Sequence, residues 1–447
     1  MYNKILHLSY RLEQNRVFTS IKAGLVFLIP VLIIGSIVIA VKNFPIPAFT
    51  SFLENAFDGH IVGILDLLYD STMGLMSVYL SCTVTYCYAS TFHDVKSDFK
   101  ITAVIASLGC FLISFGAPMG SFRFADFGAL GIASAIICAL AATTLLYWFS
   151  RWKLFQFSFY ADGAAQQFQA VVSMIFPMMF TLVIFALFSK AVQLSTGEQN
   201  LNYFLSNLFV NLFQNISAEL LRGILFVVLL NGLWFFGMHG GNIMEPVAQS
   251  FFVEAIKDPE KIVNKSFLDS FALIGGSGTS LCLLLALIFF ARNQSGKRLA
   301  WSAASFSIFN MNELLVYGLP VILNPALLIP FLFTPVLSLC IAYFATVIGF
   351  LPVVHVTVAW TVPVLFSGYE ATGSYRGVIV QIVIVVAGTL FYVPFIRLSE
   401  KLQANYEQIL LDDFSGVFWK EYNTPDAAPY LGRQIETVSW QKDLRCS

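Results

Sequence analysis

The sequence contains little charge. Only 11% of its 447 residues are Asp, Glu, Lys or Arg, against about 25% in soluble globular chains, and 57% are hydrophobic. Lipid-facing surface excludes charged side chains because their transfer out of water is costly. The composition therefore indicates a polytopic membrane protein rather than a soluble domain. The formal net charge of −1 gives no indication of nucleic-acid binding.

Several familiar motifs are also missing. The seven cysteines include no Cys-x-x-Cys pair, so we expect reduced thiols. No metal centre is expected either, because one Glu and one His far apart in the sequence, without a second carboxylate, are weak evidence for metal ligation. Neither a Walker loop, nor a dinucleotide fingerprint, nor a nucleophile elbow is found, and no cofactor is expected. The first 22 residues are polar and lack a small-residue cleavage site. They are typical of a cytoplasmic start rather than of a signal peptide.

Long apolar stretches recur along the chain. A span needs about 20 predominantly apolar residues, and about nine stretches satisfy this. The predicted spans are 22–41, 61–91, 100–117, 127–149, 170–193, 220–238, 270–291, 326–350 and 375–396. A further segment, 200–214, alternates apolar and amide residues at helical spacing. It either lies along the membrane interface or adds a span.

Basic residues in short loops predict the orientation, because Lys and Arg favour the cytoplasmic side. They cluster before the first span and at 96–100, 151–153, 292–298 and 397–401. Both termini are therefore expected in the cytoplasm.

The loop 257–265 is also basic, and full crossings at 220–238 and 270–291 would put it on the opposite side from 292–298. We therefore expect a segment near His239 or Glu313 to enter the membrane and turn back. Non-helical backbone is tolerated at that depth where it is buried in protein or lines a cavity.

The stretch "NMNELLVYGLPVILNP", residues 310–325, is polar where a span would be apolar. Glu313 at membrane depth must be protonated, paired or hydrogen-bonded. Asn310, Asn312 and Asn324 offer donors and acceptors beside it. One interpretation is a structural role, in which these polar side chains hydrogen-bond to one another and stabilise a re-entrant hairpin. The other is a pocket for a ligand rich in hydroxyls.

The stretch "NGLWFFGMHGGNIMEP", residues 231–246, places His239 among glycines at the end of a span. Glycines interrupt a helix and let backbone groups face a cavity. Asn242 follows within one turn. His239 is either a structural residue at a helix end or, as we prefer, part of a functional site.

Two further segments suit a pocket. "FALIGGSGTSL", residues 271–281, exposes backbone amides that can bind hydroxyls, although small residues also serve helix packing. "AWTVP", residues 359–363, offers an indole that can stack on a sugar ring or anchor the chain at the membrane interface. The candidate residues are Gly276, Ser277, Thr279, Trp360 and Thr361.

Together these segments resemble the membrane component, enzyme IIC, of the bacterial phosphoenolpyruvate-dependent sugar phosphotransferase system, in its lactose, cellobiose and diacetylchitobiose branch. The resemblance covers about residues 10–405. The matching segments are "IKAGLVFLIPVLIIGSIVIAVKNFP", "LWFFGMHGGNI", "GGSGTSL", "FNMNELLVYGLPVILNP", "AWTVP" and "SGYEATGSYRG".

The resemblance implies an all-α protein of the bacterial plasma (inner) membrane, a homodimer with about ten spans and two re-entrant hairpins per protomer. It implies an oligosaccharide that is bound in the membrane, translocated, and phosphorylated by a separate IIB protein carrying a phosphocysteine. The protein would then be a subunit of a protein-phosphocysteine–sugar phosphotransferase. The membrane domain would cover residues 1–405, and residues 406–447 would form a polar cytoplasmic tail or linker.

The resemblance also implies roles for single residues. Glu313 and His239 would bind sugar hydroxyls, and either of them would accept the proton of the attacking hydroxyl. Asn312 and Asn242 would support them. Gly276, Ser277 and Thr279 would line the site, and Trp360 and Thr361 would close it.

This sequence departs from the family at two places. Leu314 follows Glu313 where the family usually has proline, and residues 159–171 lack the prolines expected before the fifth span. These differences keep a second hypothesis open, a IIC-like sensor that binds sugar and signals through its tail, for example to a cyclic-dinucleotide phosphodiesterase domain. A channel or ion-coupled permease has less support, because the sequence indicates no second buried carboxylate.

Overall fold

The computed structural model is helical throughout the residues it describes, with no strand among them. Those residues are 15–421 except 45, 93, 117–122, 153–165, 199, 237, 320 and 323. The second departure from the family, at 159–171, lies mostly outside them. The all-α prediction is thus confirmed for the described part of the chain.

Eight helices are long and apolar enough to cross a membrane. They are Arg16–Lys42, His60–Ala89, Ser97–Ser114, Ala129–Arg151, Phe168–Thr196, Lys265–Phe290, Pro325–Val347 and Tyr375–Leu402. Eight of the nine predicted stretches coincide with them. The ninth, predicted at 220–238, forms the 17-residue helix α11 (Glu219–Phe235). The count of about ten spans and the two re-entrant hairpins stay predictions.

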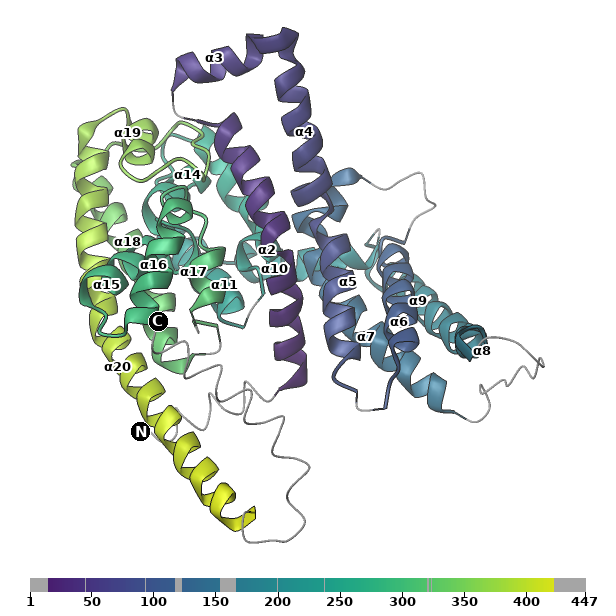
Figure 1. The fold of residues 1–447 in the computed structure, drawn as a ribbon. Helices are drawn as coiled ribbons and strands as arrows, with labels where there is room; N and C mark the ends of the chain where they lie inside the picture. Colours follow the sequence, from purple (N-terminus) through teal and green to yellow (C-terminus); the bar gives the residue numbers. More distant parts are fainter. Residues whose placement is uncertain are drawn as a thin grey trace. The chain divides into compact units, whose positions relative to one another are not determined.

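The first half of the chain forms one group of helices (Figure 1). They are α2 (Arg16–Lys42), α3 (Pro47–Asn55), α4 (His60–Thr72), α5 (Met76–Ala89), α6 (Ser97–Ser114), α7 (Ile132–Arg151), α8 (Gln166–Val172) and α9 (Ile175–Thr196). Small residues let α2 approach its neighbours closely, as is common between membrane helices. A Cβ on Gly24 would lie 2.6 Å from Val84 of α5, and one on Gly35 would lie 2.2 Å from Met73.

The second half contains long helices and many short pieces. The helices are α10 (Leu201–Gln214), α11, α12 (Gly240–Ile243), α13 (Glu245–Ala248), α14 (Lys265–Phe267), α15 (Ser280–Phe290), α16 (Gln294–Ser307), α17 (Glu313–Gly318), α18 (Pro325–Val347), α19 (Phe366–Thr372) and α20 (Tyr375–Glu421). Its largest buried side chains, among them Trp234, Phe271 and Phe331, belong to one apolar core. Hydrophobic burial thus holds the short pieces around α11 and α18.

Several connections in this half are π-helical or 3₁₀ turns. Gln249–Val253 (η7) and Leu268–Ala272 (η9) are π-helical, and Ser277–Thr279 (η10) is a 3₁₀ turn. Turns of the π type are rare and frequently mark functional sites. Both of them lie in the part of the chain that separates α11 from α15.

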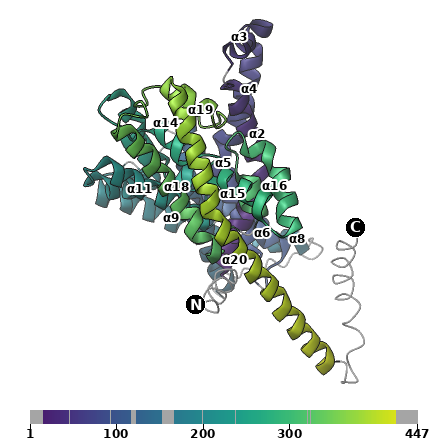
Figure 2. The same cartoon turned by 90° about the vertical axis from the view of Figure 1, so that its left-hand side faces the viewer.

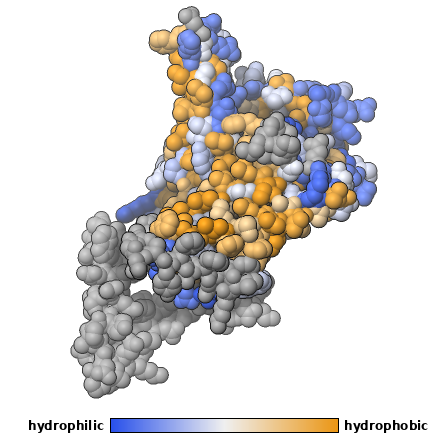
Figure 3. Space-filling model, turned by 90° about the vertical axis from the view of Figure 1, so that its right-hand side faces the viewer, coloured by the Kyte–Doolittle hydropathy of each residue, from blue (hydrophilic) through white to orange (hydrophobic). Residues whose placement is uncertain are grey.

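An arm formed by α3 and α4 projects beyond the other helices in both ribbon views (Figures 1 and 2). Apolar residues cover much of the face on the side of α6, α8 and α9 (Figure 3). The exposed apolar side chains of α6 and α9 include Ile105 and Leu187, which are 56% and 66% exposed. Such surface is unfavourable in water and is expected where helices meet lipid.

The chain divides into two compact units, Met1–Ile396 and Arg397–Ser447. The first contains every candidate site residue. The predicted boundary between 405 and 406 stays a prediction, because residues 422–447 of the tail lie outside the described residues.

Candidate functional site

A cavity of about 710 Å³ lies in the first unit. Residues from both halves of that unit line it, with Met73, Met76 and Ala129 coming from the first group of helices. Its size is typical of pockets that hold small-molecule ligands. Seven of the nine predicted site residues line it: His239, Asn242, Gly276, Ser277, Asn312, Glu313 and Trp360.

His239 is placed by the turn between α11 and α12. It precedes α12, and its Nδ1 accepts a hydrogen bond from the backbone N–H of Asn242 at 3.3 Å. The ring lies 4.5 Å from the Trp234 ring, centroid to centroid. Gly240 makes this turn possible, since a Cβ there would lie 1.9 Å from the carbonyl oxygen of Leu230.

Glu313 begins α17 and faces the histidine. Its Oε1 lies 4.0 Å from Nε2 of His239, which is too far for a direct hydrogen bond. The two side chains are only 8% and 13% exposed. Since Nδ1 of His239 accepts a bond, its ring proton belongs on Nε2, which points toward Glu313. A ligand hydroxyl near both groups would meet one donor and one acceptor.

Burial shifts both acid–base equilibria toward the neutral forms. Both residues lie outside the eight candidate spans. Burial raises the pKa of Glu313, although backbone hydrogen bonds at Asn312 and Glu313 oppose the shift. Burial lowers the pKa of His239 to about 4. His239 is therefore neutral at pH 7, and Glu313 is more basic than an exposed glutamate.

The glycine-rich loop is fixed against the segment that carries Glu313. Asn310 accepts a bond from Gly275 N–H at 2.6 Å, and Asn312 donates to the carbonyl of Ser277 at 3.1 Å. Gly276 has a φ of +94°, and a Cβ there would lie 2.7 Å from the carbonyl oxygen of Asn310. Only glycine allows this close approach of two backbones.

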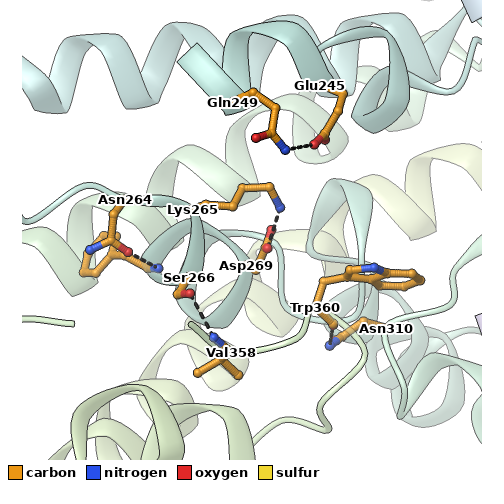
Figure 4. Close-up of polar contacts among 10 residues, drawn as sticks. Glu245, Gln249, Asn264, Lys265, Ser266, Asp269, Asn310, Val358 and Trp360 are labelled. Carbon is orange, nitrogen blue, oxygen red and sulfur yellow. Dashed lines mark hydrogen bonds and ion pairs between the residues drawn. The ribbon is translucent and has the colours of Figure 1, made fainter. Parts of the chain in front are cut away.

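Trp360 reaches the cavity from a loop that Asn310 also holds. The Asn310 amide donates to the carbonyl of Trp360 at 2.6 Å (Figure 4). It also donates to the carbonyl of Val362 at 3.0 Å. Thr279 and Thr361, however, do not line the cavity. The Thr279 hydroxyl donates to the carbonyl of Ala272, and Thr361 is 1% exposed. Both threonines were expected at the site because of the family resemblance, which does not show which way a side chain turns.

Asn324, the remaining polar residue of 310–325, accepts a bond from Ala326 N–H at the start of α18. It caps a helix rather than lining the cavity. Both interpretations of this stretch therefore hold in part. Its first residues line the cavity, and Asn324 near its end has a structural role.

Four polar residues of the cavity wall were not among the predicted site residues. We call them the Lys265 cluster: Glu245, Gln249, Lys265 and Asp269. Figure 4 shows the Lys265 amine between the Glu245–Gln249 pair and Asp269. Lys265 forms an ion pair with Asp269, and Glu245 accepts a bond from Gln249 at 2.6 Å. The spacing of Lys265 and Asp269, four residues apart at the start of an apolar run, was the available signal.

The expectation of no second buried carboxylate is wrong. The side chains of Asp126 and Asp269 are only 7% and 10% exposed. Each is paired with a cation, Arg123 and Lys265 respectively, which makes its burial tolerable.

The chain is similar to known transport proteins. Residues 22–335 match the family model "Phosphotransferase system, EIIC". The lichenan permease IIC component of Bacillus subtilis is 25% identical over 434 residues, covering 91% of this chain and 94% of that protein. The cellobiose-specific EIIC component of Geobacillus stearothermophilus is 27% identical over 441 residues, covering 91% and 95%.

Two further similarities concern the fold and a domain fusion. The crystal structure of the transporter ChbC, the IIC component for N,N'-diacetylchitobiose, superposes with a TM-score of 0.53 at 24% identity, covering 89% of this chain and 96% of that one. The lactose-specific EIICB component of Staphylococcus haemolyticus is 22% identical over 424 residues, covering 90% of this chain and 70% of that protein. Because the family model spans more than half of the chain, this multi-pass membrane protein belongs to the EIIC family of the sugar phosphotransferase system.

Proposed function

We propose that this EIIC protein binds a β-linked oligosaccharide of the cellobiose, chitobiose or lactose type in the cavity and translocates it for phosphorylation by a IIB protein. One observation carries the proposal: His239 Nε2 and Glu313 Oε1 lie 4.0 Å apart in the wall of a 710 Å³ cavity. The names of the relatives, which include lichenan and cellobiose, support this substrate class.

Each of the cavity residues has a distinct role in this proposal. The Nε2–H of neutral His239 donates to a sugar hydroxyl oxygen, while Glu313 accepts the hydroxyl proton. Trp360 offers an aromatic face for the apolar side of the ring. Asn312 fixes the Gly276–Ser277 backbone beside the sugar, and Asn242 fixes the His239 ring.

Phosphoryl transfer to the sugar requires a group that accepts the proton of the attacking hydroxyl, and Glu313 is placed to be that group. The hydroxyl oxygen attacks phosphorus of the IIB phosphocysteine, an O–P bond forms, and the S–P bond breaks to release the cysteine thiolate. The proton of the hydroxyl moves to Glu313. A raised pKa suits this role, because a base works best when its pKa approaches the ambient pH.

The partner and the setting follow from the same proposal. IIB supplies the phosphoryl group from the cytoplasmic side of the bacterial plasma membrane, where both chain termini also lie. Two copies form a homodimer. The fused EIICB relative supports a partnership with IIB, since its name places both components in one chain.

A transport assay tests the proposal. Vesicles holding the protein enclose phosphoenolpyruvate, the general phosphotransfer proteins and IIB, and labelled cellobiose is added outside. We expect phosphorylated cellobiose inside, and none when IIB is omitted. Cellobiose binding without phosphorylation by any IIB supplied would contradict transport and favour the sensor hypothesis. No feature of the described residues otherwise favours a sensor.

A further inference from the structure

Tyr317 lies next to Glu313 in α17 but takes no part in the proposed mechanism. It follows Glu313 by four residues, so both side chains lie on the same face of the helix. Helical side chains lean toward the N-terminus of their helix, so the Tyr317 ring leans toward the turn that carries Glu313. Tyr317 does not line the cavity. Any contact that it makes with Glu313 therefore comes from the protein side and not from the ligand side.

Aromatic packing fixes the Tyr317 ring close to the site. Its centroid lies 5.8 Å from that of Trp234, and the Trp234 centroid lies 4.5 Å from that of His239. Tyr317 packs against the apolar core around Trp234 and also against a second core, which α2 forms with α5 and α7. In agreement with this, α17 contacts α2 (Figure 1). The ring is thus fixed between the two groups of helices.

The hydroxyl of Tyr317 is not explained by this packing. It is buried, and it has no hydrogen-bond partner among the described residues. A buried hydroxyl without a partner costs free energy, and a phenylalanine ring would pack in the same place without that cost. Burial raises the pKa of Tyr317 well above its ordinary value, and the charge of Glu313 raises it further. The hydroxyl therefore keeps its proton and is available as a hydrogen-bond donor.

Glu313 needs such a donor in its ionised form. The proposed function requires an ionised Glu313 that accepts the proton of the sugar hydroxyl, whereas burial favours the neutral form. A hydrogen bond to a carboxylate is roughly twice as strong as one between neutral groups. A phenolic O–H beside Glu313 would therefore favour the ionised form that the reaction uses.

Other charged and titratable groups also surround Glu313. The helices packed against α17 are α2, α15 and α16. Of these, α15 contains no Asp, Glu, Lys or Arg, and the thiol of its Cys282 donates to the carbonyl of Val385 at 3.6 Å. The charged residues of α2 and α16 lie toward the helix ends and are Arg16, Lys22, Lys42, Lys297 and Arg298. The titratable residues that share the cavity wall with Glu313 are Tyr69, Asp70, His239, Glu245, Lys265 and Asp269. Tyr317 alone shares both the helix and the helix face of Glu313.

We propose that Tyr317 is a positioning residue for Glu313. Its hydroxyl donates a hydrogen bond to the Glu313 carboxylate when Glu313 is ionised, and this bond holds the carboxylate ready to accept the proton of the attacking sugar hydroxyl. The proton of Tyr317 stays on the phenol throughout. The inference rests on the proposed function, since it concerns the base of the phosphoryl transfer.

The variant Tyr317→Phe tests this role, because it removes the hydroxyl and keeps the ring. Initial rates of cellobiose phosphorylation at saturating cellobiose are measured against pH, in vesicles that enclose phosphoenolpyruvate, the general phosphotransfer proteins and excess IIB. Without the donor the carboxylate is less stable, so the acid limb of the rate profile should move to higher pH by about one pH unit. The rate on that limb should fall about tenfold and recover at higher pH. At the pH of full rate, the Kd of cellobiose should stay within about twofold.

The thermal midpoint distinguishes this role from a structural one. Because the hydroxyl has no partner among the described residues, Tyr317→Phe should leave the midpoint of the free protein unchanged or raise it. In a second background, Glu313→Gln, the further change Tyr317→Phe should alter the remaining rate by less than about twofold, because Tyr317 acts through Glu313.

Tyr79 provides a matched control. It packs against the same core formed by α2, its hydroxyl donates to the carbonyl of Ser71 at 2.8 Å, and it does not line the cavity. Tyr79→Phe should leave the pH profile of phosphorylation unchanged. An equal shift of the acid limb in Tyr79→Phe and Tyr317→Phe would contradict a specific role for Tyr317.

The remaining outcomes separate the inference from the proposed function. An unchanged pH profile in Tyr317→Phe, with cellobiose still phosphorylated, overturns the inference alone. A rate that falls equally at every pH, together with a lower thermal midpoint, also overturns it, because the hydroxyl then has a structural role. Failure of the unaltered protein to phosphorylate cellobiose overturns the proposed function and the inference together.

Discussion

The side-chain oxygen and the side-chain amide of Asn310 both form hydrogen bonds to backbone groups of other segments. Its oxygen accepts from Gly275 N–H, and its amide donates to the carbonyls of Trp360 and Val362. It also adopts a φ of +62°, which asparagine tolerates better than most residues. One buried side chain thus positions the glycine loop, the tryptophan loop and, through its own backbone, Glu313.

Replacing this residue tests its positioning role. Asn310→Ala should lower stability by roughly 2–4 kcal/mol, because three buried backbone groups lose their partner. Sugar affinity should fall as well, since Trp360 and the glycine loop are no longer fixed. The matched change Asn200→Ala removes another buried asparagine, which caps α10. It should cost about 1 kcal/mol without affecting binding, and equal effects of both changes on binding would contradict the role of Asn310.

His239 should make stability depend on pH. Its pKa is about 4 in the folded protein and about 6.5 when unfolded, so between these values only the unfolded state binds the proton. Stability therefore falls as the pH decreases from about 6.5 to about 4, by up to about 3 kcal/mol from this residue. Thermal midpoints in detergent should show a smaller loss over this range for His239→Gln. Identical pH profiles would exclude a buried neutral histidine.

At the level of secondary-structure elements, the cavity depends on interruptions of helices. The turn at Gly240, the loop Gly275–Thr279 and the π-helical turns all interrupt regular helix in segments that contribute residues to the cavity wall. Gly278 shows how tightly these turns are packed. Its N–H donates to Asn231, and its carbonyl accepts from the Tyr392 hydroxyl, both at 2.6 Å.

Gly278→Ala should destabilise the protein through two effects. Its φ is +72°, and a Cβ would lie 2.3 Å from the Phe331 ring. The matched change Gly197→Ala has a similar φ of +75° but meets nothing within 4 Å. It should cost about 1 kcal/mol from backbone strain alone, whereas Gly278→Ala should cost about 1–3 kcal/mol more. Equal thermal midpoints for the two variants would contradict the close packing of this loop.

The sequence predicted long elements better than short ones. Apolar stretches identified eight spans, because span length and hydropathy are local properties. The Lys265 cluster was not predicted, because Lys265 ends a basic loop in the sequence and its pairing with Asp269 depends on the local fold. Thr279 was predicted to line the site and Thr361 to close it, but neither residue lines the cavity. Side-chain direction in an irregular turn depends on tertiary packing, which hydropathy does not contain.

For the whole molecule, the orientation in the membrane is the main expectation still to be measured. The positions of the basic loops predict that both termini lie in the cytoplasm and that the α3–α4 arm lies outside the cell. Phe57 lies near the end of that arm and is 78% exposed. In intact cells a membrane-impermeant maleimide should label Phe57→Cys but not Lys96→Cys, which lies between α5 and α6. The reverse pattern would invert the orientation.

The central claim is that the cavity beside Glu313 binds the sugar. Its most direct test is the equilibrium affinity for cellobiose of the purified protein and of Glu313→Gln, which keeps the shape of the side chain but removes its charge. We predict that the variant retains its thermal midpoint and elution profile while its affinity falls about tenfold or more. Unchanged affinity in a variant that fails to assemble would show instead that Glu313 is a structural residue.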